Sequence, residues 1–206
     1  MIRQLCNKYG GEKEPRTASL KESPVRSEVI RLVDKASDGD FEAFGDLYGI
    51  YLEPIYRYVY YHVNNRMMAE DITEEVFVKA WKAIGSCRGR GKTFSSWIYR
   101  IAHNHIINTL RNNNKSIAME TEGLIALSDR RQKTGKRIDG YELSEMLDEL
   151  PLNQKHVIVL KFIEGMSNSE ISKILNKSEV AVRILQMRGL AALRQCITAG
   201  GGVNGA

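Results

Sequence analysis

The sequence predicts an all-α protein of two small helical domains joined by a flexible linker. Apolar residues recur at helical spacing over about 27–112 and again over about 141–197. Between them, residues 113–139 lose this period and are rich in Gly, Ser, Thr and charge. We find no strand-like alternation, no glycine-rich phosphate loop and no internal repeat, and the 206 residues include only four prolines. These observations favour helices throughout.

The composition is that of an ordinary globular protein. The hydrophobic share is 43%, the charged share is 27% and the net charge is +5. No apolar run approaches the roughly 18 residues that a membrane helix needs, and residues 1–16 lack the apolar core of a signal peptide. We therefore expect a cytoplasmic protein without membrane insertion. The mild excess of positive charge permits a nucleic-acid partner without requiring one.

The points where the periodicity changes divide the chain into five segments. They are a flexible N-terminal tail (1–26), a first helical domain (27–112), a linker (113–139), a second helical domain (140–198) and a glycine-rich tail (199–206).

Four helices are expected in the first domain. Asp40 follows a helix-stopping Asp-Gly pair and is placed to cap a long second helix. Pro54 lies inside that helix, so we expect a kink or a division there. The predicted helices begin near Ser27, Asp40, Met68 and Phe94, and a Gly/Arg-rich turn over 87–91 precedes the last one.

In the second domain the periodicity predicts helices over 141–150, 152–163, 168–175 and 179–197. A short helix, a tight turn at Asn176–Ser178 and a longer basic helix form the pattern of a helix-turn-helix. Such a motif places its second helix in the major groove of DNA. The side chains that this helix would present there include Arg183, Ile184, Met187 and Arg188.

The charge is distributed unevenly along the chain. No acidic residue occurs between Glu75 and Glu120, and none follows Glu179. The first of these stretches holds eight Lys and Arg residues interleaved with aromatic residues and histidines. Because acidic groups repel phosphates and aromatic rings stack on bases, the pattern favours binding of single-stranded nucleic acid. Two solvated helix faces with chance clustering are the alternative interpretation.

No residue group is typical of catalysis or of metal binding. His103 and His105 stand two positions apart, so on a helix they point in different directions, and no third ligand lies near in sequence. The three cysteines show no zinc-ligand spacing; Cys87, beside Arg88 and Arg90, is either a reactive thiol or, more simply, a surface thiol. We expect no enzyme activity, no cofactor and no metal.

Three segments resemble bacterial sigma factors, the promoter-specificity subunits of RNA polymerase. Met68–Trp81 resembles their AEDLVQETFLRAW signature, and Phe94–Asn104 resembles FxxWLYRIARN. The segment from Leu150 to Arg188 resembles their fourth region. The layout of two domains joined only by a linker is similar to the extracytoplasmic-function group of the sigma-70 superfamily.

The resemblance implies three sets of contacts. The second sigma region docks on the β′ clamp helices of core RNA polymerase, which implies contacts by Asp71, Glu74 and Glu75, with Phe77 and Trp81 at the edge of the contact or in the core. Binding and melting of the minus-ten element is implied for Arg88, Lys92, Trp97, Tyr99, Arg100, His103, Asn104, Asn108 and Arg111, with Asn104 in the pocket for an extruded base. Recognition of the minus-35 element is implied for Ser178, Glu179, Arg183, Ile184, Met187 and Arg188.

The resemblance further implies contact with the polymerase β subunit, an anti-sigma partner and a monomer when free. A stand-alone dimeric helix-turn-helix regulator is the main alternative, and it leaves the basic stretch 76–119 without a purpose. An enzyme acting on nucleic acid is a third class, but the basic stretch offers no carboxylates to hold a metal.

Overall fold

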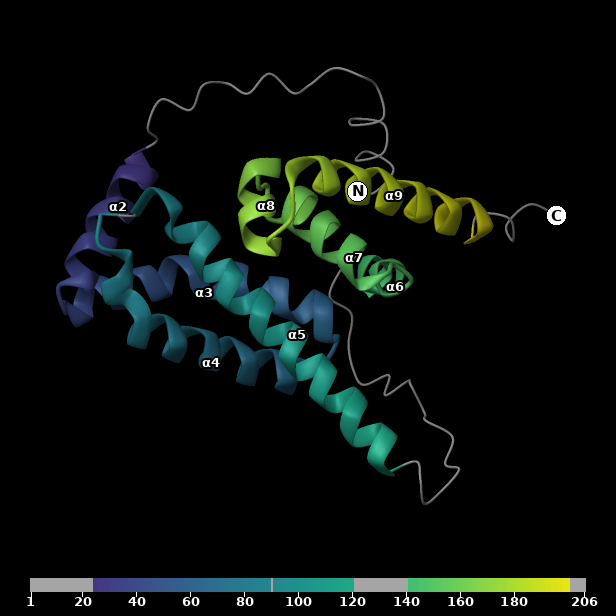
Figure 1. The fold of residues 1–206 in the computed structure, drawn as a ribbon, viewed down its shortest axis with the longest axis horizontal. Coiled ribbons are helices and arrows are strands. Elements are labelled where there is room, and N and C mark those ends of the chain that lie inside the picture. Colours follow the sequence, from purple (N-terminus) through teal and green to yellow (C-terminus); the bar gives the residue numbers. More distant parts are fainter. Residues whose placement is uncertain (1–23, 90, 121–140, 201–206) are drawn as a thin grey trace.

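The computed structural model describes residues 24–89, 91–120 and 141–200, and these residues contain helices and no strand (Figure 1). The helices α2 to α5 pack as one bundle, and α6 to α9 form a second group that lies against α3 and α5. The expected all-α class is therefore confirmed. The N-terminal tail and most of the expected linker lie outside the described residues.

In the first bundle, the ends of the helices lie close to the predicted positions. α2 (Pro24–Ser37) is followed by α3 (Phe41–Val63), and the Asp40 carboxylate accepts a hydrogen bond from the Ala43 N–H at 3.0 Å. This is the predicted N-cap. Asn64, in the left-handed conformation, ends α3, and Asn65 caps α4 (Arg66–Ala83) through the Met68 N–H.

Of the two outcomes expected at Pro54, a kink or a division of the second helix, the division does not occur. α3 is one helix of 23 residues with Pro54 inside it. A proline removes one backbone hydrogen bond, but apolar residues on both sides, including Leu47, Ile55 and Tyr58, are buried in the same core. We infer that this burial stabilises the helix on both sides of the proline.

The last helix of the bundle is longer than expected. Two short 3₁₀ turns, η1 (Ile84–Cys87) and η2 (Gly91–Thr93), lead into α5 (Phe94–Glu120), which passes Arg111 and includes the first residues assigned to the linker. Apolar periodicity stops near Arg111, but residues 95–120 contain no Gly or Pro that would break a helix. Residues 113–120, which we expected to lie in a flexible linker, are therefore helical.

The second group contains the predicted helix-turn-helix. α6 (Tyr141–Asp148), α7 (Leu152–Ile158) with the π-helical turn η3 (Val159–Ile163), and α8 (Asn168–Leu175) lead to α9 (Glu179–Gly200). Ser167 and Glu170 form a reciprocal capping box at the start of α8. Asn176 adopts φ +51° in the turn before α9, as its tolerance of the left-handed region predicts.

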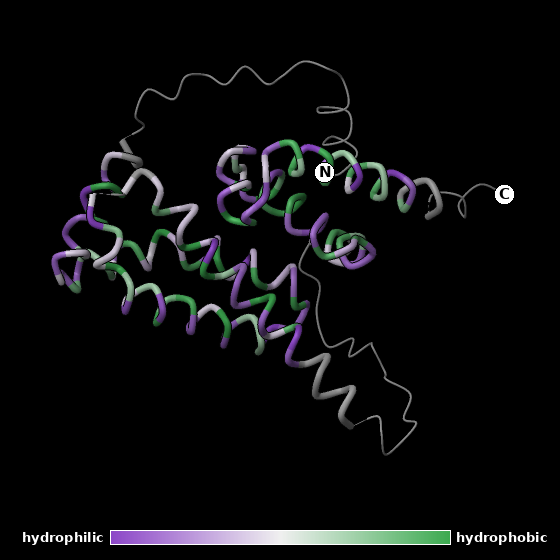
Figure 2. Tube along the Cα trace, in the orientation of Figure 1, coloured by the Kyte–Doolittle hydropathy of each residue, from purple (hydrophilic) through white to green (hydrophobic). Residues whose placement is uncertain are grey.

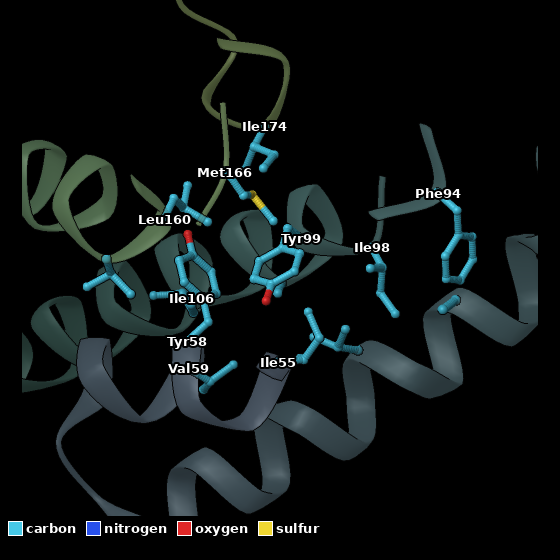
Figure 3. Close-up of a cluster of buried hydrophobic side chains, with 14 of the residues drawn as sticks. Ile55, Tyr58, Val59, Phe94, Ile98, Tyr99, Ile106, Leu160, Met166 and Ile174 are labelled. Atoms are coloured by element: carbon cyan, nitrogen blue, oxygen red, sulfur yellow. The ribbon is translucent and has the colours of Figure 1, made fainter. Parts of the chain in front are cut away.

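The two groups share one hydrophobic core, although separate domains were expected. Tyr58 and Ile55 of α3, Tyr99 of α5, and Leu160, Met166 and Ile174 of the second group point toward one another (Figure 3). The hydropathy pattern shows the same organisation, because hydrophobic residues follow the facing sides of the helices and hydrophilic residues the outer sides (Figure 2). The described residues thus form a closed arrangement of the two groups.

Candidate nucleic-acid interface

One face of α5 carries a stripe of exposed basic and amide side chains. Arg100, Asn104, Asn108 and Arg111 are all exposed and follow one another at intervals of three or four residues, so they share one side of the helix. Guanidinium groups bind phosphates, and amides can pair with base edges. The structure therefore brings together four of the residues that the sequence associated with the minus-ten element.

The turn before α5 is fixed to α2. A Cβ on Gly91 would meet the Ile30 Cα at 2.6 Å, so only glycine allows this close approach. The Arg88 guanidinium, which is exposed, pairs with Asp38 at 3.3 Å, and the neighbouring Gly89 N–H donates to Asp34 at 2.9 Å. The turn holds Arg88 near the start of α5, whereas the side chain of Lys92 lies outside the described residues.

The aromatic side chains expected to stack on bases are not available in this arrangement. Tyr99 is only 3% exposed, and its hydroxyl donates a hydrogen bond to Glu164 at 2.7 Å. Trp97 is partly buried beside Phe94, with ring centroids 5.5 Å apart. His103 lies edge-on against His156, 4.4 Å between centroids. For Tyr99 and His103 the reason is that the second helical group packs on this side of α5, which the sequence could not indicate. The contact described for Trp97 is with Phe94 of the same helix.

Glu164 connects the two groups of helices. Its side chain is 2% exposed and accepts two hydrogen bonds from the Arg57 guanidinium, each of 2.9 Å, in addition to that from Tyr99. A bidentate pair of this kind is among the stronger polar contacts in proteins. Burial and the neighbouring Glu164 raise the pKa of Tyr99, so the phenol stays protonated and donates. We call Glu164, Arg57 and Tyr99 the Glu164 latch.

Sequence reasoning missed this latch. Arg57 and Glu164 are 107 positions apart, and neither was among the candidate site residues, although Glu164 lies within the segment Leu150–Arg188. No local pattern marks such a pair. A cleft of about 360 Å³ opens beside it, between α3, α5 and the segment 164–170, so solvent reaches the edge of the latch.

The outer face of α4 carries the expected acidic residues together with two apolar ones. Asp71, Glu74 and Glu75 are exposed, and Met67 and Val78, which the sequence reasoning missed, lie on the same side at helical spacing. Met67 is 75% exposed. Exposed apolar side chains beside charged ones are typical of a protein interface.

Phe77 does not belong to that exposed face. It is 5% exposed and packs edge-on against Tyr48, 4.7 Å between ring centroids. Phe77, which we expected at the edge of the polymerase contact or in the core, is a core residue in this form, because it falls on the inward side of α4 with Val76 and Ala80. Cys87 is likewise buried rather than a surface thiol.

Glu75 has partners within the molecule. It pairs with Lys79 at 3.6 Å and with the His105 ring at 3.1 Å, which links α4 to α5. His105 thus faces α4 while His103 faces α7, as expected for residues two apart on a helix. Among the described residues there is no group of three or more His, Cys, Asp or Glu arranged to hold a metal ion.

The exposed face of α9 presents the expected recognition residues. Ser178 caps the helix by accepting from the Ala181 N–H at 3.2 Å. Glu179 pairs with Arg183 at 3.6 Å, which holds the guanidinium over the first turn. The exposed residues of this face are Ser178, Glu179, Val180, Arg183, Ile184, Met187 and Arg188, of which Val180 was not predicted.

Comparison with known proteins identifies the two halves of the chain. Residues 47–116 match the family model of sigma-70 region 2, and residues 141–193 match that of sigma-70 region 4. The chain is 34% identical over 179 residues to the ECF RNA polymerase sigma factor SigW of Bacillus subtilis, covering 81% of this chain and 95% of SigW. The chain belongs to the extracytoplasmic-function group of the sigma-70 family.

This sigma factor is a promoter-recognition subunit of RNA polymerase, and its family binds core polymerase and promoter DNA. A stand-alone dimeric regulator is not favoured. A second relative, the ECF RNA polymerase sigma factor BldN of Streptomyces coelicolor, is 30% identical over 173 residues, which are 82% of this chain and 66% of BldN.

Two solved structures share the fold of this sigma factor. CnrH, in complex with the cytosolic domain of CnrY, is 24% identical with a TM-score of 0.67, over 84% of this chain and 98% of CnrH. The sigma factor RpoE in complex with the anti-sigma factor NepR, from Bartonella quintana, is 17% identical with a TM-score of 0.64, over 75% and 96% of the two chains. In the described part of our chain, no helix is long and apolar enough to cross a membrane.

Proposed function

We propose that this sigma factor uses three separate helix faces for its three contacts during transcription initiation. The exposed face of α4 binds core polymerase, the exposed face of α5 binds the minus-ten element, and the exposed face of α9 binds the minus-35 element. The observation that carries the proposal is that several motif residues of each set lie together on one exposed helix face. They are Asp71, Glu74 and Glu75 on α4, Arg100, Asn104, Asn108 and Arg111 on α5, and Arg183, Ile184, Met187 and Arg188 on α9. The chain works in the cytoplasm and has no catalytic step of its own, because RNA synthesis belongs to the polymerase.

On α4, the contact combines charge and apolar surface. Asp71 and Glu74 attract the clamp helices of the β′ subunit, and Met67 and Val78 add apolar area at the two ends of the stripe. Glu75 is a weaker candidate for direct contact, because it is engaged by Lys79 and His105.

On α5, Arg100 and Arg111 bind phosphates of the non-template strand, while Asn104 holds an extruded base and Asn108 contacts the strand beside it. Tyr99 and His103 join this surface only after the second group of helices moves away, because Glu164 and His156 of that group hold them. The closed arrangement is therefore a resting form, and the form that is bound to the promoter is open.

On α9, Arg183 and Arg188 bind guanine edges or phosphates, and Ile184 and Met187 contact thymine methyl groups. The free protein is a monomer in this proposal. CnrH and RpoE were solved with CnrY and NepR bound, which supports an anti-sigma partner that holds this chain in a closed form.

Transcription reconstituted with core polymerase tests the proposal. We expect promoter-dependent transcripts with the wild-type chain, and loss of polymerase binding by at least tenfold with Asp71→Lys/Glu74→Lys, because both charges are exposed and no hydrogen bond is described for either side chain. Binding is measured by displacement of a fluorescent sigma factor from core polymerase.

Glu53→Lys is the matched control. Glu53 is exposed on α3, away from the α4 stripe, and only a 3.9 Å contact with Arg57 involves it. Unchanged polymerase affinity of the α4 variant would refute the docking face. If the free protein gave a specific footprint on a palindrome and no polymerase-dependent transcript appeared, the whole proposal of a role in transcription initiation would be refuted.

A further inference from the structure

Three histidines from three helices meet between the two groups. His62 of α3 stacks on His156 of α7 with ring centroids 4.0 Å apart and planes 19° apart. His103 of α5 lies edge-on to His156 at 4.4 Å. His62 and His156 are buried, so these rings, which we call the histidine seam, hold the first group against the second.

Hydrogen bonding fixes the proton positions only in part. His62 Nδ1 lies 2.6 Å from the Tyr58 carbonyl, which can only accept, so Nδ1 carries the proton and Nε2 carries a lone pair. The Tyr58 hydroxyl pairs with His156 Nδ1 at 2.8 Å. Three buried nitrogens have no hydrogen-bond partner: His62 Nε2, His103 Nδ1 and His156 Nε2. An unpartnered buried polar atom is costly, which indicates a functional reason for keeping it.

The charges around the seam disfavour a positive ring. Two lysines lie near the rings: Lys155 of α7, which is buried, and Lys177 of the turn before α9. Both disfavour a proton on His156. Lys155 also disfavours a proton on His62, and Lys177 disfavours one on His103. The two carboxylates that border the seam are engaged elsewhere, since Asp148 of α6 accepts from Lys155 at 2.6 Å and Glu164 is held in its latch. The titratable groups that face the rings or border them are Tyr58 of α3, Tyr99 of α5, Asp148, Lys155, Glu164 and Lys177.

Burial and these neighbours act on the pKa of each ring in the same direction. Burial lowers the pKa of His62 to about 3 and that of His103 to about 4, and it holds the pKa of His156 well below its usual value of 6.5. The rings are therefore neutral in the closed form at neutral pH. In an open form, where water reaches them, they would regain values near 6.5.

We infer that the histidine seam is a proton-sensitive lock: neutral rings hold regions 2 and 4 closed, and protonation of the rings separates the regions while each keeps its helices. If both rings were protonated, a charged His62 would stack on a charged His156 with Lys155 beside both. Neither of the two carboxylates that border the seam is free to neutralise these positive charges. Opening also withdraws Glu164 from Tyr99 and exposes the second side of α5. That last consequence rests on the proposed function, whereas the opening itself does not.

The direction of the pH dependence follows from proton binding. The open form binds more protons than the closed form between about pH 6.5 and pH 4, so closure is strongest above pH 6.5 and weakens as the pH falls. With three rings titrating near 6.5 in the open form, going from pH 7.5 to pH 6.0 multiplies the opening constant by up to about 50. Each ring contributes a factor of about 4.

Small-angle X-ray scattering of the full chain, with circular dichroism on the same samples, tests the lock. We expect the radius of gyration to increase between pH 7.5 and pH 6.0, while the helical signal stays constant. His62→Asn/His156→Asn should remove most of this response, because asparagine does not titrate and its amide can still donate to the Tyr58 carbonyl and accept from the Tyr58 hydroxyl.

His105→Asn is the matched control, because His105 also lies on α5 but faces α4 and should leave the response unchanged. If the double variant fails to fold, NMR titration of the wild-type histidines replaces it. We expect the three rings to gain their protons over the same pH range in which the radius of gyration increases. An unchanged radius down to pH 5.5, or an expansion that loses helix in parallel, would overturn the lock. Transcription at pH 6.0 distinguishes the two proposals. The lock is then weakened, so failure to transcribe would refute the sigma roles but leave the scattering result intact.

Discussion

At the scale of single residues, Glu164 connects three helices although it was not among the candidate site residues. A carboxylate with a side chain only 2% exposed is costly to bury unless it is paired, and here a guanidinium fork and a phenol satisfy it. Its partners are on α3 and α5, so one side chain ties region 4 to two helices of region 2. The pair keeps Tyr99 from the solvent and therefore from any nucleic-acid strand.

We expect Glu164→Gln to lower the free energy of unfolding by about 1–3 kcal/mol, because it replaces the charge-assisted bonds to Arg57 by a neutral contact. Urea denaturation measures this change. Glu53→Gln is the control, since Glu53 meets the same Arg57 only at 3.9 Å and is exposed, and its effect should stay within about 0.5 kcal/mol. Equal effects of the two substitutions would contradict the role of the latch.

At the scale of helices, the element ends are decided by local chemistry and their placement by close packing. Asp40, Asn65 and Ser167 cap helices exactly where a short polar side chain precedes an apolar repeat. The crossing of α7 and α9 is different, because it depends on Gly189. A Cβ there would meet Ile158 Cγ1 at 2.8 Å, and Ile158 is itself buried.

Gly189→Ala should therefore force α9 away from α7 and destabilise region 4 by about 1–3 kcal/mol, as overpacking does. Thermal unfolding followed by circular dichroism measures the effect. Gly45→Ala on α3 is the matched control. No atom lies within 4 Å of its added Cβ, and alanine favours a helix, so this variant should be as stable as the wild type or up to about 1 kcal/mol more stable.

At the scale of the whole molecule, the closed arrangement and the proposed promoter-bound form need different separations of the two regions. Two promoter elements two helical turns apart lie about 70 Å from each other. The 20 residues between α5 and α6 span at most about 66–72 Å when extended. Because α5 continues to Glu120, this reach is shorter than the expected linker would give, and it matches the separation closely.

Deletion of ten of these 20 residues should abolish transcription from promoters that need both elements, because the remaining ten span only about 33–36 Å. Polymerase binding through α4 should persist. Run-off transcription with the reconstituted polymerase measures the loss. Replacement of the same ten residues by Gly and Ser is the control for length, and a deletion variant that transcribes normally would contradict the extended geometry.

Much of the candidate site could be predicted because its residues repeat along single helices. Asp71 and Glu74 share a face of α4, and Arg183 and Met187 share a face of α9, so spacing alone indicated which side chains lie together. Burial could not be predicted in the same way. The motif that contains Tyr99 indicates a side chain that stacks on bases, but region 4 covers this side chain in the structure.

The sequence by itself determined the all-α class, the Asp40 cap, the helix-turn-helix and the family, because these depend on short-range periodicity and on motifs within continuous segments of the chain. Only the tertiary structure decided that the two regions share a core, that Glu164 holds Tyr99 and Arg57, and that His62, His103 and His156 meet. Those contacts join positions 53 to 107 residues apart. No local pattern encodes them, since they form only when two amphipathic surfaces find their most favourable packing.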